Sequence, residues 1–172
     1  MRTVMAFAAL TLSARIVTAQ EVSYDYDKTA AFAGYHTYAW VTGHPVDDAL
    51  NHKRIVAAVD SQLKVKGFRL VDGSEHPDVL VAYHASFGKN LQVTGFSNGW
   101  GGYRFANRSA SARAEEITVG TLVIDLVDAA TRSIVWRGTA SKDLDPKASP
   151  EKREKNINRA VEKVFRKYPP SN

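Results

Sequence analysis

The stretch ITVGTLVIDLVDAATRSIVWRGTASKDL, residues 117–144, decides the fold, because apolar and polar residues alternate in it on both sides of a short break. A period of two is typical of a strand that buries one face, and the small and polar residues of the break suit a turn. If the turn centres on residues 129–131, Ile124 lies opposite Trp136. The apolar face of this predicted hairpin holds Leu122, Ile124, Leu126, Ile134 and Trp136.

The rest of the chain predicts four more strands and two helices. The strands are expected at 22–26, 35–41, 68–71 and 78–87, and the helices within 49–68 and 149–170. Residues 78–87 are apolar on both faces, which is typical of a strand near the centre of a sheet. The order β β α β β, insertion, β β α predicts an α+β fold: a single mixed, largely antiparallel β-sheet with two amphipathic helices packed on one face.

Both predicted helices carry start and stop signals. In the first, Asp47 or Asp48 suits the N-cap, and Gly67 suits the position after the last turn. In the second, Ser149 caps the helix and Pro150 occupies the first turn. Apolar residues recur on one face of each helix: Ile55, Val56, Val59 and Leu63 in the first, and Ile157, Val161, Val164, Phe165 and Tyr168 in the second.

Two ion pairs are expected on the surface. Asp60 and Lys64 are four residues apart on the outside of the first helix. On the outer face of the hairpin, Asp125 lies diagonal to Arg137. Exposed pairs of this kind contribute about 0–1 kcal/mol each, so we expect little stability from them.

The composition limits the classes of function. The chain has 172 residues, 24% charged and 44% hydrophobic, which is ordinary for one globular domain. It has no cysteine, and this excludes disulfides, thiolate metal ligands and a cysteine nucleophile. The net charge is +5, and it is +3 without Arg2 and Arg15 of residues 1–19; a charge of +3 is too small to indicate a nucleic-acid partner.

Residues 1–19 have the pattern of a secretory signal peptide. Arg2 precedes an apolar run of nine residues, which is too short to span a bilayer, and small residues favour cleavage after Ala19. Cleavage removes Arg2 and Arg15 and no acid, so the net charge of the remaining domain, 20–172, falls from +5 to +3. An N-terminal helix packed on the domain is the alternative interpretation. No later segment is apolar enough to cross a membrane.

Five motifs resemble one bacterial family when they are read in order. They are FAGYHTYAW (32–40), the helix pattern RI…AVD.QL..KGF (54–68), PDVLVAYH (77–84), GTLVIDLVDAATRSIVWRGTA (120–140) and YPP (168–170). Together they resemble the family of domain of unknown function 4136 over about residues 22 to 170. The resemblance implies a small exported envelope protein of a Gram-negative bacterium, often a lipoprotein, with an α+β fold and no assigned activity.

The chain departs from the lipoprotein pattern of that family in one respect. A lipoprotein carries its lipid on a cysteine at the cleavage site, and this sequence has none. We therefore expect a protein of the periplasm or cell envelope that is not lipid-anchored through cysteine. No cofactor is implied.

Four of the five histidines are candidate metal ligands by their position in the sequence. His44, Asp48 and His52 are spaced four apart, and the last two would share a helix face. Zinc needs three or four converging ligands, and His44 lies before a proline outside the helix, so exposed polar residues are the favoured interpretation. His36 and His84 lie in strands and could meet across the sheet, but ordinary hydrogen-bonded histidines are again favoured. We expect no metal site.

No catalytic set can be assembled from the spacing of the sequence. No serine lies in a G-x-S-x-G elbow, and the aspartates Asp25, Asp27, Asp125 and Asp128 lie in or beside strands. Asp128 suits the opening of the hairpin turn. A periplasmic hydrolase or metal-dependent enzyme that uses strand Asp and His residues stays as the alternative function. Trp40 and Trp136 could line a sugar or peptide site, but their apolar strands favour core positions.

The stretch FSNGWGGYRF, 96–105, lies in a Gly- and aromatic-rich insertion predicted at 88–116. Its glycines do not have phosphate-binding spacing and it lacks a P-loop lysine. It is either a connecting loop or a partner-binding loop. The residues that would bind a partner are Phe96, Trp100, Tyr103, Arg104 and Phe105. We expect a non-enzymatic binding or structural module whose partner is an envelope protein, peptidoglycan or a lipid headgroup.

Overall fold

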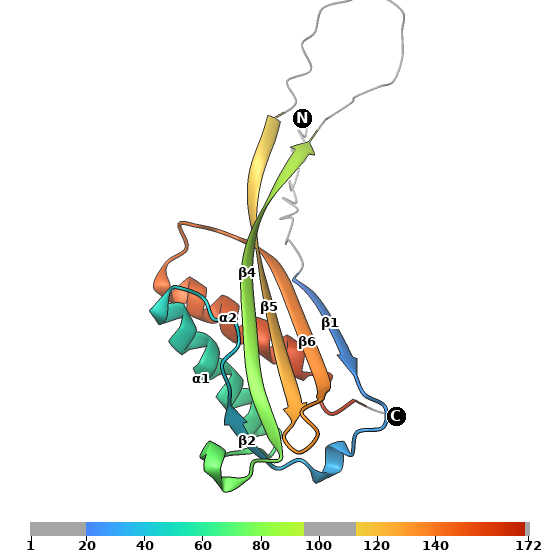
Figure 1. Cartoon of the computed structure of the whole chain (residues 1–172). Coiled ribbons are helices and arrows are strands. Elements are labelled where there is room, and N and C mark those ends of the chain that lie inside the picture. Colours follow the sequence, from blue (N-terminus) through green and yellow to red (C-terminus); the bar gives the residue numbers. More distant parts are fainter. Residues whose placement is uncertain (1–19, 95–112, 171–172) are drawn as a thin grey trace, which may run out of the picture.

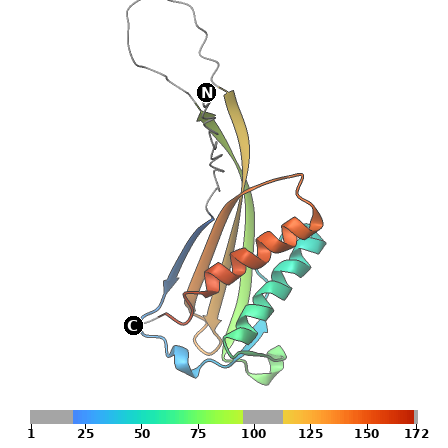
Figure 2. The same ribbon diagram turned by 180° about the vertical axis from the view of Figure 1, so that it is seen from behind.

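The computed structural model describes residues 20–94 and 113–170. In these residues a six-stranded sheet runs in the order β1-β6-β5-β4-β2-β3, and two helices cover one of its faces (Figures 1 and 2). The strands are β1 (Glu21–Tyr26), β2 (Thr37–Trp40), β3 (Arg69–Leu70), β4 (Val79–Thr94), β5 (Arg113–Asp128) and β6 (Ile134–Leu144). The helices are α1 (Ala49–Val65) and α2 (Pro150–Phe165), and 3-10 turns lie at Phe32–Gly34 and Gly73–Glu75. β2 is parallel to β3 and β4 and the other pairs are antiparallel, which confirms the predicted α+β fold.

Two predictions fall outside the described residues, namely the signal peptide at 1–19 and the aromatic stretch at 96–105. The insertion predicted at 88–116 is described only at its flanks, and these form strands rather than loop. β4 continues to Thr94 and β5 starts at Arg113, in unbroken antiparallel register.

The start and stop signals of the helices lie where the sequence predicts them. The Asp48 carboxylate accepts hydrogen bonds from two backbone N–H groups in the first turn of α1, and Ser149 caps α2. Gly67 has a φ of +87°, the left-handed conformation that ends a helix. None of the helices within the described ranges combines the length and the apolar content that crossing a bilayer requires.

The core lies between the helices and the sheet. Trp136 has no exposed surface, stacks on Phe165 with ring centroids 5.3 Å apart, and meets Tyr168 edge-on at 5.6 Å. This confirms the interpretation of Trp136 as a core residue. The fully buried aliphatic side chains around it are Val59, Leu63, Val79, Val81, Ile124, Leu126, Val161 and Val164.

The hairpin of β5 and β6 forms, but its register differs from the predicted one. Ile124 pairs with Gly138 and Leu126 pairs with Trp136, whereas we predicted Ile124 opposite Trp136. A bulge after Leu126 adds one residue to β6 next to the turn. The bulge also turns Ile134 away from the apolar face, where it was expected, and leaves it 48% exposed.

The ion pair predicted between Asp125 and Arg137 forms, but it is not exposed, and Asp60 does not form the exposed pair expected with Lys64. Asp125 lies directly opposite Arg137 and is only 2% exposed, and Arg137 donates from Nε to Oδ1 at 2.6 Å and from Nη2 to Oδ2 at 2.8 Å. Leaving such a buried charge unpaired costs about 3–5 kcal/mol, so this pair helps to fix the strand register. Asp60 faces β2, where its Oδ1 accepts hydrogen bonds from the Tyr38 hydroxyl at 2.7 Å and the Trp40 indole at 2.9 Å.

Beyond the body of the molecule, β4 and β5 continue as a two-stranded ribbon (Figure 1). Pairing of β5 with β6 stops at Thr118, which faces Leu144, while pairing with β4 continues to the end of both strands. We call residues 89–94 and 113–117 the ribbon. Neither of its outer edges has a strand partner within the described ranges.

Candidate functional site

The first candidate site is a mostly apolar cavity of about 450 Å³ between the sheet and the first turns of both helices. We call it the helix-start cavity. Its floor is the helix-facing side of the sheet, which presents Ala85, Leu122 and Ala140. Its walls include Ile55 of α1 and Ile157 of α2. The cavity exists because small side chains on the floor do not fill the space beneath the helix starts.

Gly120 explains how one side of the cavity closes. A Cβ built on Gly120 would lie 2.6 Å from Cδ1 of Leu144, closer than real contacts allow. The absence of a side chain on β5 therefore lets Leu144 of β6 lie flat across the sheet. Both residues line the cavity.

Lys142 and Asn156 form a polar corner of the helix-start cavity, and Asp48, Asp145 and Arg153 are the other charged residues in its lining. Lys142 projects from β6 on the helix-facing side, and its Nζ donates to Oδ1 of Asn156 on α2 at 2.9 Å. Burial lowers the pKa of Lys142, and the positive charges of Arg159, Lys152 and Lys163 lower it further. The surroundings of Lys142 therefore favour its neutral form, and a bound anion would favour its charged form.

The loop from β6 to α2 lies beside the cavity and is fastened to the helix. Arg153 donates from Nε to the carbonyl of Ala148 at 3.0 Å and from Nη2 to the carbonyl of Pro146 at 3.1 Å. The Lys152 ammonium donates to Asp145 at 2.8 Å. Arg153 and Asp145 both line the cavity, so these bonds fix the shape of its entrance.

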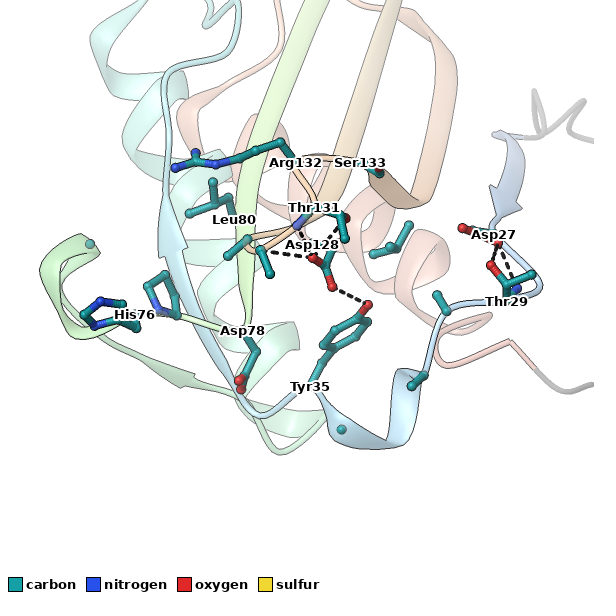
Figure 3. A pocket seen from close by; sticks show the side chains of 18 residues that line it. Asp27, Thr29, Tyr35, His76, Asp78, Leu80, Asp128, Thr131, Arg132 and Ser133 are labelled. Atoms are coloured by element: carbon teal, nitrogen blue, oxygen red, sulfur yellow. Dashed lines mark hydrogen bonds between the residues drawn. The ribbon is translucent and has the colours of Figure 1, made fainter.

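The second candidate site is a cleft of about 800 Å³ next to the β5–β6 turn (Figure 3). Asp27, Asp78 and Asp128 line it, together with Tyr35. The Tyr35 hydroxyl points at Asp128 and donates to its Oδ2 at 2.9 Å. Burial, with the neighbouring Asp128, raises the pKa of Tyr35 to about 12.

The carboxylates of this cleft accept hydrogen bonds from nearby backbone and hydroxyl groups. The backbone N–H of Thr131 and the Tyr35 hydroxyl hold the pKa of Asp128 below its ordinary value. Thr29 does the same for Asp27 through its hydroxyl and its N–H. Burial opposes the shift at Asp78, but hydrogen bonds from His36 and Thr37 still lower the pKa of that carboxyl. Groups that stay ionised and already accept structural hydrogen bonds are poor general acids or bases near neutral pH.

A third polar cluster lies on the sheet face opposite the helices. His84 of β4 approaches Asp125 with Nε2 at 3.4 Å from Oδ2, and its Nδ1 lies 2.9 Å from Nδ1 of His44. Arg137 completes the cluster through its bonds to Asp125. His44 is exposed and His84 is partly exposed, while the aspartate is buried. The cluster therefore covers a buried charge.

The structure separates the histidines that the sequence places at regular spacing. His44 contacts His84 rather than His36, Asp48 caps α1, and the His52 Nδ1 lies 2.5 Å from the hydroxyl of Tyr83. Within the described ranges, no three His, Asp or Glu side chains converge in a way that would hold a metal ion.

The other candidate residues also take structural positions. Asp25 lies on the edge strand β1 opposite Arg137. Trp40 is partly buried, and it packs edge-on against Tyr83 and donates its indole N–H to Asp60. The proposed binding residues Phe96, Trp100, Tyr103, Arg104 and Phe105 lie outside the described residues.

The helix-start cavity was missed by the sequence reasoning, although one signal for it was present. Lys142 lies an even number of residues beyond Trp136 and Ala140 in the same strand, so it falls on the apolar face. A lysine there, opposite Gly120, marks a place where the core is open. The cavity itself depends on the angle of the helices, which the periodicity of the sequence does not give.

The comparisons with known proteins match this fold. The sequence model of the family described as "Domain of unknown function (DUF4136)" matches residues 22–170. A solved DUF4136 family protein from Bacteroides thetaiotaomicron is 13% identical with a TM-score of 0.53, and the match covers 87% of this chain and 96% of that chain. No match was found among curated proteins.

Two other solved structures are similar in fold. A PDZ domain protein from Parabacteroides distasonis is 15% identical with a TM-score of 0.57, and the match covers 90% of this chain but only 38% of that chain. The PelC dodecamer from Paraburkholderia phytofirmans is 10% identical with a TM-score of 0.52, and the match covers 86% of this chain and 95% of that chain. At these identities the similarity extends to the fold alone.

Proposed function

The chain belongs to the DUF4136 family, and from this premise we propose that it is an exported cell-envelope protein that acts by binding a partner, not by catalysis. The signal-like sequence of residues 1–19 supports export to the periplasm or envelope. The absence of cysteine supports a form that carries no lipid on cysteine.

The observation that carries the binding proposal is the ribbon of β4 and β5. Its backbone N–H and C=O groups on both outer edges have no strand partner within the described ranges. Free strand edges pair readily with an extended segment of another protein, and the main-chain hydrogen bonds supply affinity. An envelope protein is therefore the favoured partner, ahead of peptidoglycan and lipid headgroups.

The aromatic stretch at 96–105 is proposed to add side-chain contacts to this interaction. The chain leaves β4 at Thr94 and enters β5 at Arg113, both at the outer end of the ribbon. Aromatic and arginine side chains are enriched in protein interfaces. The proposed contact residues are Phe96, Trp100, Tyr103, Arg104 and Phe105.

The alternative, a hydrolase or metal-dependent enzyme, has less support from the described residues. The strand aspartates on which it would depend are engaged in turns and in the pair with Arg137. A stoichiometric divalent metal in the purified protein would favour this alternative.

Two shortened variants test the proposal. In the first, residues 95–108 are deleted, which leaves residues 109–112 as a short loop between the strands of the ribbon. In the second, residues 90–117 are replaced by Asn-Gly, a two-residue turn that suits a hairpin. The wild-type protein is mixed with a crosslinker and an envelope fraction, and in parallel with isolated peptidoglycan and with anionic vesicles.

We expect the wild-type protein to give a discrete protein crosslink, the first variant to give less, and the second to give none. Equal thermal unfolding midpoints of all three proteins serve as the control that the body is intact. An undiminished crosslink with the second variant would remove the ribbon as the binding element. Binding to peptidoglycan or vesicles alone would contradict a protein partner.

A further inference from the structure

We propose that the helix-start cavity binds a long-chain fatty acid, with the alkyl chain between helices and sheet and the carboxylate at Lys142 and Asn156. This site is separate from the ribbon and does not depend on the function proposed above. Four observations carry it: the volume and the lining of the cavity, the polar corner at Lys142 and Asn156, the charge around that corner, and the exposed aromatic ring at its rim.

The cavity has the size and the lining of a ligand site. Small-molecule pockets are about 300–1,000 Å³, mostly apolar, with a few placed polar groups, and this cavity measures about 450 Å³. Leu144 and Ile157 add apolar side chains to the lining, and Leu122 and Ala140 form part of its floor. A flexible alkyl chain fits such an irregular apolar space without needing hydrogen bonds.

An apolar ring is left uncovered where the cavity opens. Phe87 lies on the helix-facing side of β4, lines the cavity and is 61% exposed. On the same side of the strand, Tyr83 is buried and Ala85 is partly buried. Exposing a phenylalanine to water is unfavourable, so a bound alkyl chain that covers the ring would be stabilised.

The polar corner presents donors in the arrangement that a carboxylate needs. Asn156 uses its Oδ1 to accept from Lys142, so its side-chain N–H₂ remains available to donate. The ammonium of Lys142 has three hydrogens, of which this bond uses one. Two neighbouring donors can therefore each bind one oxygen of a carboxylate, in charge-assisted hydrogen bonds.

The charges beside this corner favour an anion. Besides burial, Arg159, Lys152 and Lys163 lower the pKa of Lys142, and Asp143 opposes them. Asp48 and Asp145 also line the cavity, but Asp48 already accepts hydrogen bonds from the first turn of α1, and Asp145 accepts one from Lys152. A bound carboxylate would reduce the repulsion between Lys142 and the neighbouring cations, whereas a cationic amphiphile would increase it. The match of charge and apolar volume indicates a fatty acid.

Displacement of a fluorescent fatty acid, dansyl-undecanoate, by dodecanoate tests the proposal on the purified protein. Lys142→Met removes the ammonium and keeps the apolar part of the side chain. Lys155→Met is the matched control, since Lys155 lies on the exposed side of α2, away from the cavity. Asn156→Leu is a second variant of the same corner.

We expect dodecanoate to bind the wild-type protein with one-to-one stoichiometry. Lys142→Met should weaken the affinity at least about tenfold, as the loss of a charge-assisted hydrogen bond does. Asn156→Leu should also weaken it, while Lys155→Met should leave it unchanged. Thermal unfolding of each variant shows whether it is folded.

Two results would overturn the proposal. One is no displacement by dodecanoate at all. The other is equal affinity of the Lys142→Met and Lys155→Met proteins, or equal affinity for dodecanoate and dodecanol, because either would exclude a role for charge.

Discussion

The aromatic core beneath α2 allows a quantitative test of the fold through Trp136→Ala. Trp136 is fully buried, and its ring lies 5.3 Å from that of Phe165 and 5.6 Å from that of Tyr168. The substitution removes both contacts and leaves a cavity, and tryptophan-to-alanine changes in cores cost about 3–5 kcal/mol. The indole N–H has no hydrogen-bond partner within the described ranges, so the loss comes from packing alone.

Urea denaturation of the purified variant should therefore show a free energy of unfolding that is lower by about 3–5 kcal/mol. Ile134→Ala is the matched control, since Ile134 lies in the same strand but is 48% exposed. The control should change the stability by less than about 1 kcal/mol. If the Trp136→Ala protein also lost less than about 1 kcal/mol, the indole could not be packed as described, and the reasoning would be refuted.

Three further substitutions test individual contacts. Gly138→Ala should lower the stability in urea by about 1–3 kcal/mol, because its Cβ would lie 2.3 Å from Cγ1 of Val164; an unchanged midpoint would contradict this approach of α2 to the sheet. Asp60→Ala should cost about 1–3 kcal/mol in the same assay, because the partly buried indole N–H of Trp40 loses its acceptor; a neutral result would place that N–H in water. Asp128→Asn should flatten the acid dependence of stability measured as urea midpoints against pH. The pKa of Asp128 is lowered in the folded protein. The stabilisation by the Asp128 carboxylate is therefore present above the unfolded pKa and is lost as the pH falls through the folded pKa. Equal acid slopes in the wild-type and Asp128→Asn proteins would contradict this role of Asp128.

Much of the fold could be predicted because its signals are local. The cap at Asp48, the stop at Gly67 and the apolar stripes are written in short stretches of sequence, and the structure has them in place. The central position of β4 also followed from residues that are apolar on both faces. These features depend on single elements and their period.

The errors arose where two elements meet. The register of β5 and β6 was missed because a bulge after Leu126 depends on both strands at once. Asp60 was assigned to the surface because the sequence does not show that two hydrogen-bond donors of β2 lie beneath it. Asp125 was likewise assigned to the surface, although His84 and Arg137 cover it.

The candidate sites divide in the same way. Spacing along the chain offered metal binding by His44, Asp48 and His52 only as a disfavoured alternative. In the fold His44 contacts His84 of β4, and His52 contacts Tyr83. The helix-start cavity lies among residues far apart in the sequence, such as Ala85 and Ile157. The one sequence signal for the cavity is the unusual presence of a lysine, Lys142, on the apolar face of its strand.

The most direct test of the proposed function is crosslinking to envelope proteins, compared between the wild-type protein and the variant in which residues 90–117 are replaced by a two-residue turn. If the protein binds a partner through the ribbon, the wild-type protein gives a discrete crosslinked species and the shortened variant, with the same unfolding midpoint, gives none. A crosslink of equal yield in both proteins would contradict that account.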